Sequence, residues 1–330
     1  MLRSTLFARR VVGLAGPSSL RSMATYSPSM EEIKKLRTAS QAPMKDVKKA
    51  LVEAEGDFPA AFEWLRKKGI ASATAKAGRT AAEGLVGIFV DADKKRGAMV
   101  EVNSETDFVA RNDQFQALVA QVTRGAHAGA LLGELDTPAM AQVAVEGRLV
   151  ADLVPELVGR VGENIVVQRG TTINVAHGVV SSYTHRVASQ ELNLGRAGAL
   201  VGLEVEGELS SAKVADLETL GKKLAMHVVA AKPKFLNRDS VPAERVEAER
   251  TFVLEQVQEQ AKNKPANIVE KMVDGRMNKF FGEVTLVDQV HMVEEGNPKV
   301  SAHLEKEGAR LGLKIKLSAF QRYEIGEEQL

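Results

Sequence analysis

The spacing of apolar residues changes along this chain, and that change constrains the fold more than any other feature. Near the N-terminus and again late in the chain, apolar residues recur every three or four positions, the period of an amphipathic helix. Between these regions lie short runs rich in β-branched residues, such as 85–90 and 98–102. Strands and helices do not alternate strictly. The pattern therefore favours an α+β fold over a doubly wound parallel sheet.

The first 30 residues differ in composition from the rest. They contain no Asp or Glu, and their four arginines are spread among Leu, Val, Ala and Ser: Arg3, Arg9, Arg10 and Arg21. This composition is typical of an organelle transit peptide, with a disordered tail as the alternative. We expect a transit peptide over 1–30 and a destination in the mitochondrial matrix, with a plastid as the second choice. The remaining chain then carries 40 basic and 43 acidic residues, a net charge of −3.

Residues 31–69 show the pattern of three short helices. Ile33 and Leu36 begin one apolar face, Val47 and Leu51 continue it, and a third helix is expected to begin after Asp57. Because a unit this short makes a marginal core, we expect it to be tethered to a larger body. Residues 70–84, rich in Ala, Thr, Lys and Gly, are interpreted as a helical or flexible linker.

The larger body begins with a hairpin, 85–90 and 98–102, around a charged turn. A helix capped by Asn112 follows, and then a helical region over 140–161 that Pro155 is able to split. Further strands are expected at 165–167, 173–175, 179–183 and 199–205, a helix at 211–230, and β structure again at 284–287 and 313–317. Two helices joined by a break at 262–265 are expected within 242–281, as a projecting hairpin suited to association with a partner or a second copy.

Motifs for covalent or redox chemistry are absent from the sequence. There is no phosphate-binding G-x-x-x-x-G-K-[ST] loop, no G-x-S-x-G elbow and no H-E-x-x-H motif. The six histidines are dispersed along the chain, and the absence of cysteine excludes disulfides, thiolate catalysis and cysteine-ligated metals. The sequence therefore favours a binding protein that is not an enzyme, with no cofactor and no metal.

The segment 101–112 is unusual on physical grounds. It leaves a strand, crosses polar residues and enters a helix at Ser104 or Thr106, with Asp107 in the first turn, where an acid complements the helix dipole. One interpretation is a simple helix start with Phe108 and Val109 in the core. The other places Asp107 and Phe108 on a protruding tip, a carboxylate beside an aromatic wedge. The residues alone leave both open.

This segment also carries a resemblance. EVNSETDFVAR at 101–111 resembles the signature of the translation elongation factor Ts family, and LRTASQAPMKDVKKAL at 36–51 is similar to the family's N-terminal signature, with Ser40, Gln41 and Pro43 as departures. Further similar segments are 226–233, 269–277 and 323–327. The resemblance covers nearly all of residues 31–327.

The resemblance implies an architecture and a function. Residues 31–69 would form a ubiquitin-associated-like domain that docks on the nucleotide-binding domain of elongation factor Tu. The core would consist of two α+β subdomains, 85–177 and 178–330, with 242–281 inserted as an antiparallel coiled coil. The chain would be a guanine nucleotide exchange factor that promotes GDP release by stabilising the nucleotide-free GTPase during organellar translation. An additional C-terminal helical module after residue 330 is not expected.

The resemblance also implies the partner-binding residues. The exchange tip would comprise Asp107, Phe108, Val109, Arg111 and Asn112, although Asp107 could be only a cap. In the N-terminal domain, Arg37, Met44, Lys45 and Lys48 would face the partner, unless Met44 belongs to the small core. Tyr183 and His185 would approach the partner from the second subdomain, with Arg186 following where glycine is usual. No direct contact with nucleic acid or a membrane is expected.

A different class of function stays open. A ubiquitin-associated-like module with a basic face could serve as an adaptor for nascent chains or ubiquitin, since residues 31–80 carry 11 basic and 7 acidic residues. That alternative leaves the 101–112 segment and the large core unexplained. A nucleic-acid-binding role is weaker, given one Trp, three Tyr and the negative charge of the mature chain.

Overall fold

The computed structural model describes residues 26–129, 133–260 and 265–327. Most of the predicted transit peptide, residues 1–25, lies outside the described residues. The chain divides into two compact units, residues 1–65 and 66–330, which are described separately. Both helices and strands are present, as an α+β fold requires.

The first unit contains the three helices that the sequence predicts. These are α1 (Met30–Ser40), α2 (Met44–Glu53) and α3 (Phe58–Lys76), the last of which continues into the second unit. Leu36, Val47 and Leu51 are fully buried and form the centre of the small core. The amphipathic spacing read from the sequence is therefore confirmed for these positions.

The folded part begins earlier than the predicted boundary at residue 30. Ser29 is the N-cap of α1 and forms a capping box with Glu32, in which each side chain is bonded to the other residue's backbone N–H. The hydroxyl of Tyr26 donates a hydrogen bond to the carboxylate of Glu32 at 2.6 Å. A processed chain that keeps both the cap and the Tyr26 hydrogen bond must therefore retain residues 26–29.

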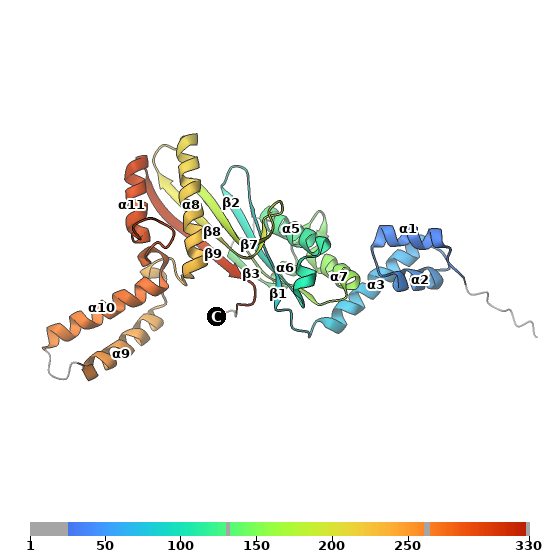
Figure 1. Ribbon diagram of the computed structural model, residues 1–330, viewed down its shortest axis with the longest axis horizontal. Coiled ribbons are helices and arrows are strands. Elements are labelled where there is room, and N and C mark those ends of the chain that lie inside the picture. The colour runs from blue at the N-terminus through green and yellow to red at the C-terminus, as the bar shows by residue number, and fades with distance from the viewer. Residues whose placement is uncertain (1–25, 130–132, 261–264, 328–330) are drawn as a thin grey trace, which may run out of the picture. The chain divides into compact units, whose positions relative to one another are not determined.

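The second unit is built on one antiparallel sheet of seven strands (Figure 1). The strands are β1 (Glu83–Val90), β2 (Arg96–Ser104), β3 (Gly133–Asp136), β6 (Ile165–Asn174), β7 (Gly178–Ser189), β8 (Leu194–Glu206) and β9 (Lys314–Glu324). The order is β3-β6-β2-β1-β8-β7, and β9 also pairs with β8. The predicted β1–β2 hairpin is confirmed, with Val90 opposite Gly97 at its turn. Pairing of β1 with β8 makes the sheet continuous across the expected division at residue 178.

Helices cover the sheet in two groups. At one end, α5 (Asp113–Ala128) and α7 (Val150–Val161) bury Phe115, Val119 and Leu157 against β1, β2 and β6. At the other end, α8 (Ser211–Ala231) and α11 (Val300–Leu311) bury Leu217 and Leu224, among others, against β7, β8 and β9 (Figure 1). Each group contributes its own apolar cluster.

The helical region expected over 140–161 is wrong in part. The structure has α6 (Thr137–Ala141), a small hairpin of β4 (Ala144–Val145) and β5 (Arg148–Leu149), and only then α7. The break lies at Glu146 and Gly147, both with positive φ (50° and 82°), and the left-handed conformation suits a tight hairpin turn. Pro155, which the sequence analysis considered as a point where the helix could divide, lies inside α7.

The strand expected at 284–287 is also wrong. The helix α10 (Ala266–Val284) runs through Val284, and a 3-10 turn, η2 (Leu286–Asp288), follows. Only Thr285 makes an isolated bridge, to Phe235. An alternating apolar pattern becomes a strand only where a neighbouring strand can pair with it, and here Leu286 is instead fully buried in the cluster beneath α8 and α11.

The helical hairpin is present. The helices α9 (Ala243–Gln260) and α10 pack against each other through Val253, Val257, Val273 and Met277 (Figure 1). Residues 261–264, which include most of the predicted break, lie outside the described residues. The helix α10 begins directly after Pro265, its N-cap residue, whose carbonyl accepts hydrogen bonds from the backbone N–H groups of Ile268 and Val269.

Three histidines that are far apart in the sequence meet in the second unit. The rings of His227 and His303 lie 5.0 and 5.4 Å from that of His291, which is fully buried. Nδ1 of His227 accepts a hydrogen bond from the Met292 backbone N–H, and Nδ1 of His291 accepts one from Val293. Burial, followed by the neighbouring His227 and His303, lowers the pKa of His291 to about 4, and burial also lowers the pKa of His227.

This cluster predicts an acid-sensitive fold. Because the folded pKa of His291 lies below the unfolded value of about 6.5, the unfolded state binds more protons between pH 6.5 and 4, and stability falls as the pH falls through that window. We expect His291 alone to remove about 2 kcal/mol between pH 7.5 and 5. Urea unfolding at both pH values tests this. His291→Phe should lose less stability on acidification than the wild type, whereas His177→Phe, at an exposed position, should match the wild type. An equal loss in all three proteins would contradict the prediction.

Candidate functional site

The segment after β2 folds into a tip. Thr106 is the N-cap of the four-residue helix α4 (Asp107–Ala110), and its hydroxyl accepts a hydrogen bond from the Val109 backbone N–H at 3.5 Å. Capping satisfies one of the N–H groups that every helix start leaves unpaired. The sequence predicted a helix start at Ser104 or Thr106, and the structure selects Thr106.

The tip exposes one aromatic side chain. Phe108 is 77% exposed, the highest value among the large hydrophobic residues that the structure describes. Its neighbours Val109 and Ala110 are 8% and 5% exposed and belong to the cluster beneath α5 and α7. The interpretation in which both Phe108 and Val109 enter the core is therefore wrong for Phe108. Val109 instead packs the tip onto the core.

The two charged residues of the tip bind each other. Arg111 donates a hydrogen bond from its guanidinium to the Asp107 carboxylate at 2.7 Å, and the two side chains are 76% and 43% exposed. An exposed pair at this spacing contributes only about 0.3–0.5 kcal/mol. Since Thr106 is the N-cap, Asp107 does not cap α4 through its side chain. Both charges therefore remain accessible to a partner.

Asn112 has a structural role next to the tip. Its side-chain oxygen accepts hydrogen bonds from the backbone N–H groups of Gln114 at 2.9 Å and Phe115 at 3.4 Å, which makes it the N-cap of α5. The cap predicted from the sequence is confirmed. Asn112 thus fixes the point at which the chain leaves the tip.

A cavity of about 450 Å³, lined by both charged and apolar residues, adjoins the tip. Asp107 and Arg111 line one side, and Arg186 and Val187 from β7 line another, with Arg196 of β8 nearby. Sequence analysis noted Arg186 only as a departure from glycine, and it missed Val187 and Arg196. The departure from glycine was the sequence feature that could have drawn attention to Arg186. Its φ is +50°, a left-handed conformation that favours glycine.

Tyr183 and His185 lie on the same strand, β7. The Tyr183 hydroxyl is 3.2 Å from Nδ1 of His185, and the two rings are 6.0 Å apart. His185 is exposed, while Tyr183 packs partly against the apolar cluster beneath α8. Arg186 and Val187, which follow directly on the strand, line the cavity beside the tip, whereas Tyr183 and His185 do not.

The residues predicted in the first unit are all accessible. Arg37 on α1 and Lys45 and Lys48 on α2 are exposed, and Met44 is 43% exposed. The alternative that placed Met44 in the small core is therefore wrong. These side chains lie on a unit whose own core is filled by other residues.

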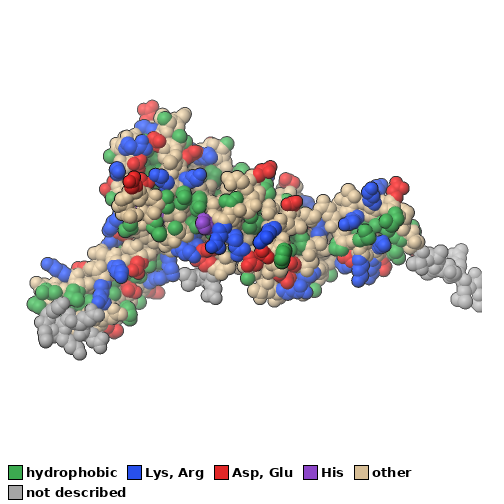
Figure 2. Space-filling model, viewed as in Figure 1, with side chains coloured by type: hydrophobic (Ala, Val, Ile, Leu, Met, Phe, Trp, Pro, Cys, Tyr) green, Lys and Arg blue, Asp and Glu red, His purple; other side chains and the backbone are tan. Residues whose placement is uncertain are grey.

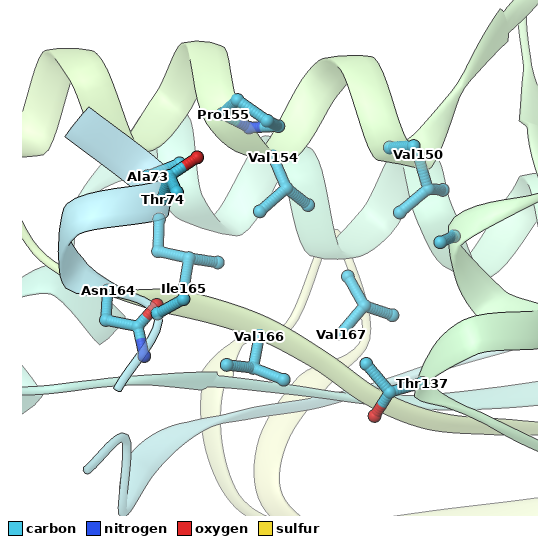
Figure 3. A pocket seen from close by; sticks show the side chains of 13 residues that line it. Ala73, Thr74, Thr137, Val150, Val154, Pro155, Asn164, Ile165, Val166 and Val167 are labelled. Atoms are coloured by element: carbon cyan, nitrogen blue, oxygen red, sulfur yellow. The ribbon is translucent and has the colours of Figure 1, made fainter. Parts of the chain in front are cut away.

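A second cavity, also of about 450 Å³, lies beside α7 (Figure 3). Its labelled wall residues are mostly apolar, with Val150 and Val154 from α7 facing Val167 from β6. Its hydroxyls are already used, because Thr137 donates to the Gln168 carbonyl at 2.8 Å and Thr74 to the Ile70 carbonyl at 3.0 Å. No charged residue lines it.

The described residues contain no group of three or more His, Asp or Glu side chains placed to hold a metal ion. Within the same residues, no helix combines the length and the apolar character needed to cross a bilayer. Figure 2 shows acidic and basic side chains interspersed on the face in view. A uniformly basic nucleic-acid-binding surface is not visible on that face.

An exposed aromatic tip on a well-packed α+β core, and accessible basic residues on a helical unit, are features suited to docking on another protein. The family model described as Elongation factor TS matches residues 105–327. A protein named Elongation factor Ts from Paramagnetospirillum magneticum is 45% identical, over 92% of this chain and 93% of its own length. Those of Rhodospirillum rubrum and Gluconobacter oxydans are 44% and 43% identical, each over 89% of this chain and 91% of their own lengths. The chain belongs to the elongation factor Ts family.

The capping geometry separates the roles of Asp107 and Asn112. Asn112→Ala should lower the free energy of unfolding by about 1 kcal/mol because α5 loses its N-cap. Asp107→Asn should cost less than about 0.5 kcal/mol because it removes only an exposed ion pair. Urea unfolding at pH 7.5 measures both. A larger loss for Asp107→Asn than for Asn112→Ala would show that Asp107 is the structural residue of the two.

Proposed function

We propose that this protein accelerates GDP release from elongation factor Tu through the tip at Phe108. As a member of the elongation factor Ts family, it is a guanine nucleotide exchange factor for elongation factor Tu. The observation that carries the tip assignment is the 77% exposure of Phe108 above the buried Val109 and Ala110. An apolar ring kept in water on a fixed helix is suited to insertion into a partner.

Exchange of this kind is a matter of binding free energy. A GTPase holds GDP through phosphate contacts and a bound magnesium ion. A factor that binds the empty GTPase more tightly than the loaded one weakens GDP binding by the same ratio. A 10⁴-fold faster release requires a barrier lower by roughly 5.5 kcal/mol. A single surface contact does not lower the barrier by that much, so several docking surfaces must contribute binding free energy.

In our proposal each surface has a separate part. Phe108 wedges between helices of the GTPase and disturbs its magnesium site, while Asp107 and Arg111 contact the displaced segment. Tyr183 and His185 extend the contact along β7. The protein contributes no bond-making chemistry and needs no cofactor of its own.

Phe108→Ala tests the wedge. Fluorescent GDP is preloaded on elongation factor Tu, and its release is followed in excess unlabelled nucleotide. The maximal release rate should fall at least tenfold, whereas the affinity for the nucleotide-free GTPase should change by less than threefold, because the other docking surfaces remain. Met292→Ala, which removes a 62% exposed apolar side chain away from the tip, is the control and should behave as the wild type. An unchanged GDP release rate for Phe108→Ala would contradict the assignment of Phe108 as the wedge.

The first unit is proposed to dock on the nucleotide-binding domain of elongation factor Tu. Arg37, Lys45 and Lys48 are exposed beside Met44, which supports a contact that is basic with an apolar centre. Such charges mainly raise the association rate of a complementary acidic surface.

Charge reversal tests this docking surface. The double variant Lys45→Glu with Lys48→Glu should lower the association rate with elongation factor Tu about tenfold at low salt and weaken the salt dependence. The maximal release rate should be retained. The control is Lys34→Glu with Lys67→Glu, which makes the same change of charge at other exposed positions. If both double variants slow association equally, the effect is one of net charge and the docking surface is misplaced.

We also propose that the protein acts in the mitochondrial matrix, on the basis of the acid-free, arginine-bearing residues 1–30. Import of the full chain into isolated mitochondria, compared with a chain beginning at residue 26, measures this.

Self-association through α9 and α10 is a further proposal. It is supported by the exposed side chains of Phe252, Leu254 and Ile268. Analytical ultracentrifugation tests it, because Phe252→Ala should sediment more slowly than a self-associating wild type.

The same GDP-release assay distinguishes nucleotide exchange from the alternative in which the protein is an adaptor for ubiquitin or nascent chains. Unchanged GDP release together with retained binding of ubiquitin or nascent chains would select it.

A further inference from the structure

Two glutamates from distant parts of the sequence hold the base of the tip. Pairing of β2 with β6 ends where Ser104 lies opposite Ile165. Just beyond this point, the Glu163 carboxylate accepts hydrogen bonds from the Thr106 backbone N–H at 3.0 Å and from the Thr106 hydroxyl at 2.8 Å. In return, Glu105 accepts one from the Asn164 backbone N–H at 2.6 Å. We call Glu105, Thr106, Glu163 and Asn164 the carboxylate clasp.

The carboxylate clasp extends the hydrogen bonding between β2 and β6 beyond their last backbone pair. Backbone N–H groups beyond the last strand pair would be left without carbonyl partners, and an unpaired buried N–H is costly. Here two carboxylates replace the carbonyls, and hydrogen bonds to a charged acceptor are stronger than neutral ones. Asn164 is only 4% exposed, and its side chain also donates to the Arg79 carbonyl at 2.8 Å. The anchor on the β6 side is therefore firmly placed.

Glu163 differs from an ordinary surface acid. Within the part of the chain that the structure describes, no cation is paired with it, whereas Glu105 has Arg79 at 3.4 Å. It follows Gly162, which ends α7 in a left-handed conformation and turns the chain toward β6. Both oxygens of Glu163 bind Thr106. Charge neutralisation does not explain this arrangement, but orientation of Thr106 does.

Thr106 transmits that orientation into the tip. Its hydroxyl donates to Glu163 and accepts from the Val109 N–H, so the residue that Glu163 holds is also the cap of α4. A helix of one turn is not stable by itself and takes its conformation from its ends. The far end is fixed by Asn112, and the near end by the clasp.

We propose that Glu163 is a positioning residue for exchange: through Thr106 it fixes the start of α4, so that Phe108 is presented to the GTPase already ordered. The inference rests on the proposed function of the tip. Ordering a flexible segment at the moment of binding consumes binding free energy. A preordered tip leaves that free energy available for displacing the partner's helix.

The first measurement needs no partner. Glu163→Gln keeps the size of the side chain but replaces one acceptor oxygen by a donor NH₂, which cannot accept from Thr106. Hydrogen exchange of the backbone amides of residues 109–112, which are the hydrogen-bonded amides of the tip, should become at least tenfold faster. Amides in the centre of β2 and β6 should keep their protection. The matched control is Glu156→Gln on α7, an acid that pairs with Arg148 and makes no contact with the tip.

The second measurement uses elongation factor Tu loaded with fluorescent GDP. Glu163→Gln should lower the maximal release rate about tenfold, with the half-saturating concentration changed less than threefold. Thr106→Ser, which keeps the hydroxyl, should match the wild type. Thr106→Val should be impaired, and its combination with Glu163→Gln should lose less than the sum of the two, because both remove the same contact.

The outcomes separate the two levels of the argument. Unchanged amide exchange in Glu163→Gln would overturn the clasp whatever the function of the tip. Faster amide exchange with an unchanged release rate would show that the order of the tip does not matter for exchange, which also overturns the proposal. If the wild type fails to accelerate GDP release, the proposed function itself fails and the positioning role fails with it, while the amide data still report whether the clasp exists.

Discussion

The burial of Val109 and Ala110 is the interaction on which the functional surface of this protein depends. These two small side chains anchor a one-turn helix to the cluster beneath α5 and α7. Successive helical residues point about 100° apart, so Phe108 lies on nearly the opposite side of α4 from Ala110. Burying Val109 and Ala110 together therefore turns Phe108 toward solvent. The exposed ring is therefore a consequence of core packing and not of local flexibility.

The sheet supplies the frame for that packing. Continuous antiparallel pairing from β3 to β7 places the end of β2, where the tip begins, and the end of β7, where Arg186 and Val187 lie, around one cavity. Strands remote in sequence thus contribute to one surface. The same pairing brings Glu163 to Thr106, because β6 begins two residues after Glu163 and runs along β2.

These features fit a factor that works through binding free energy. The structure offers an exposed aromatic tip on a packed base, a cavity of mixed polar and apolar lining next to it, and a separate helical unit with accessible basic side chains. A partner that contacts several such surfaces can be deformed by one of them, because the others stabilise the deformed complex.

The sequence by itself determined the elements with strong local signals. The helices around Leu36 and Val47, the β1–β2 hairpin and the Asn112 cap follow from apolar period and capping chemistry, which act over a few residues. The tertiary structure decided what depends on distant partners. It gave 284–287 no strand to pair with, brought His227, His291 and His303 together, turned Phe108 outward and joined Glu163 to Thr106. The physical reason is that a side chain's neighbours across a sheet or in a core are set by the topology, which the local pattern of residues does not encode.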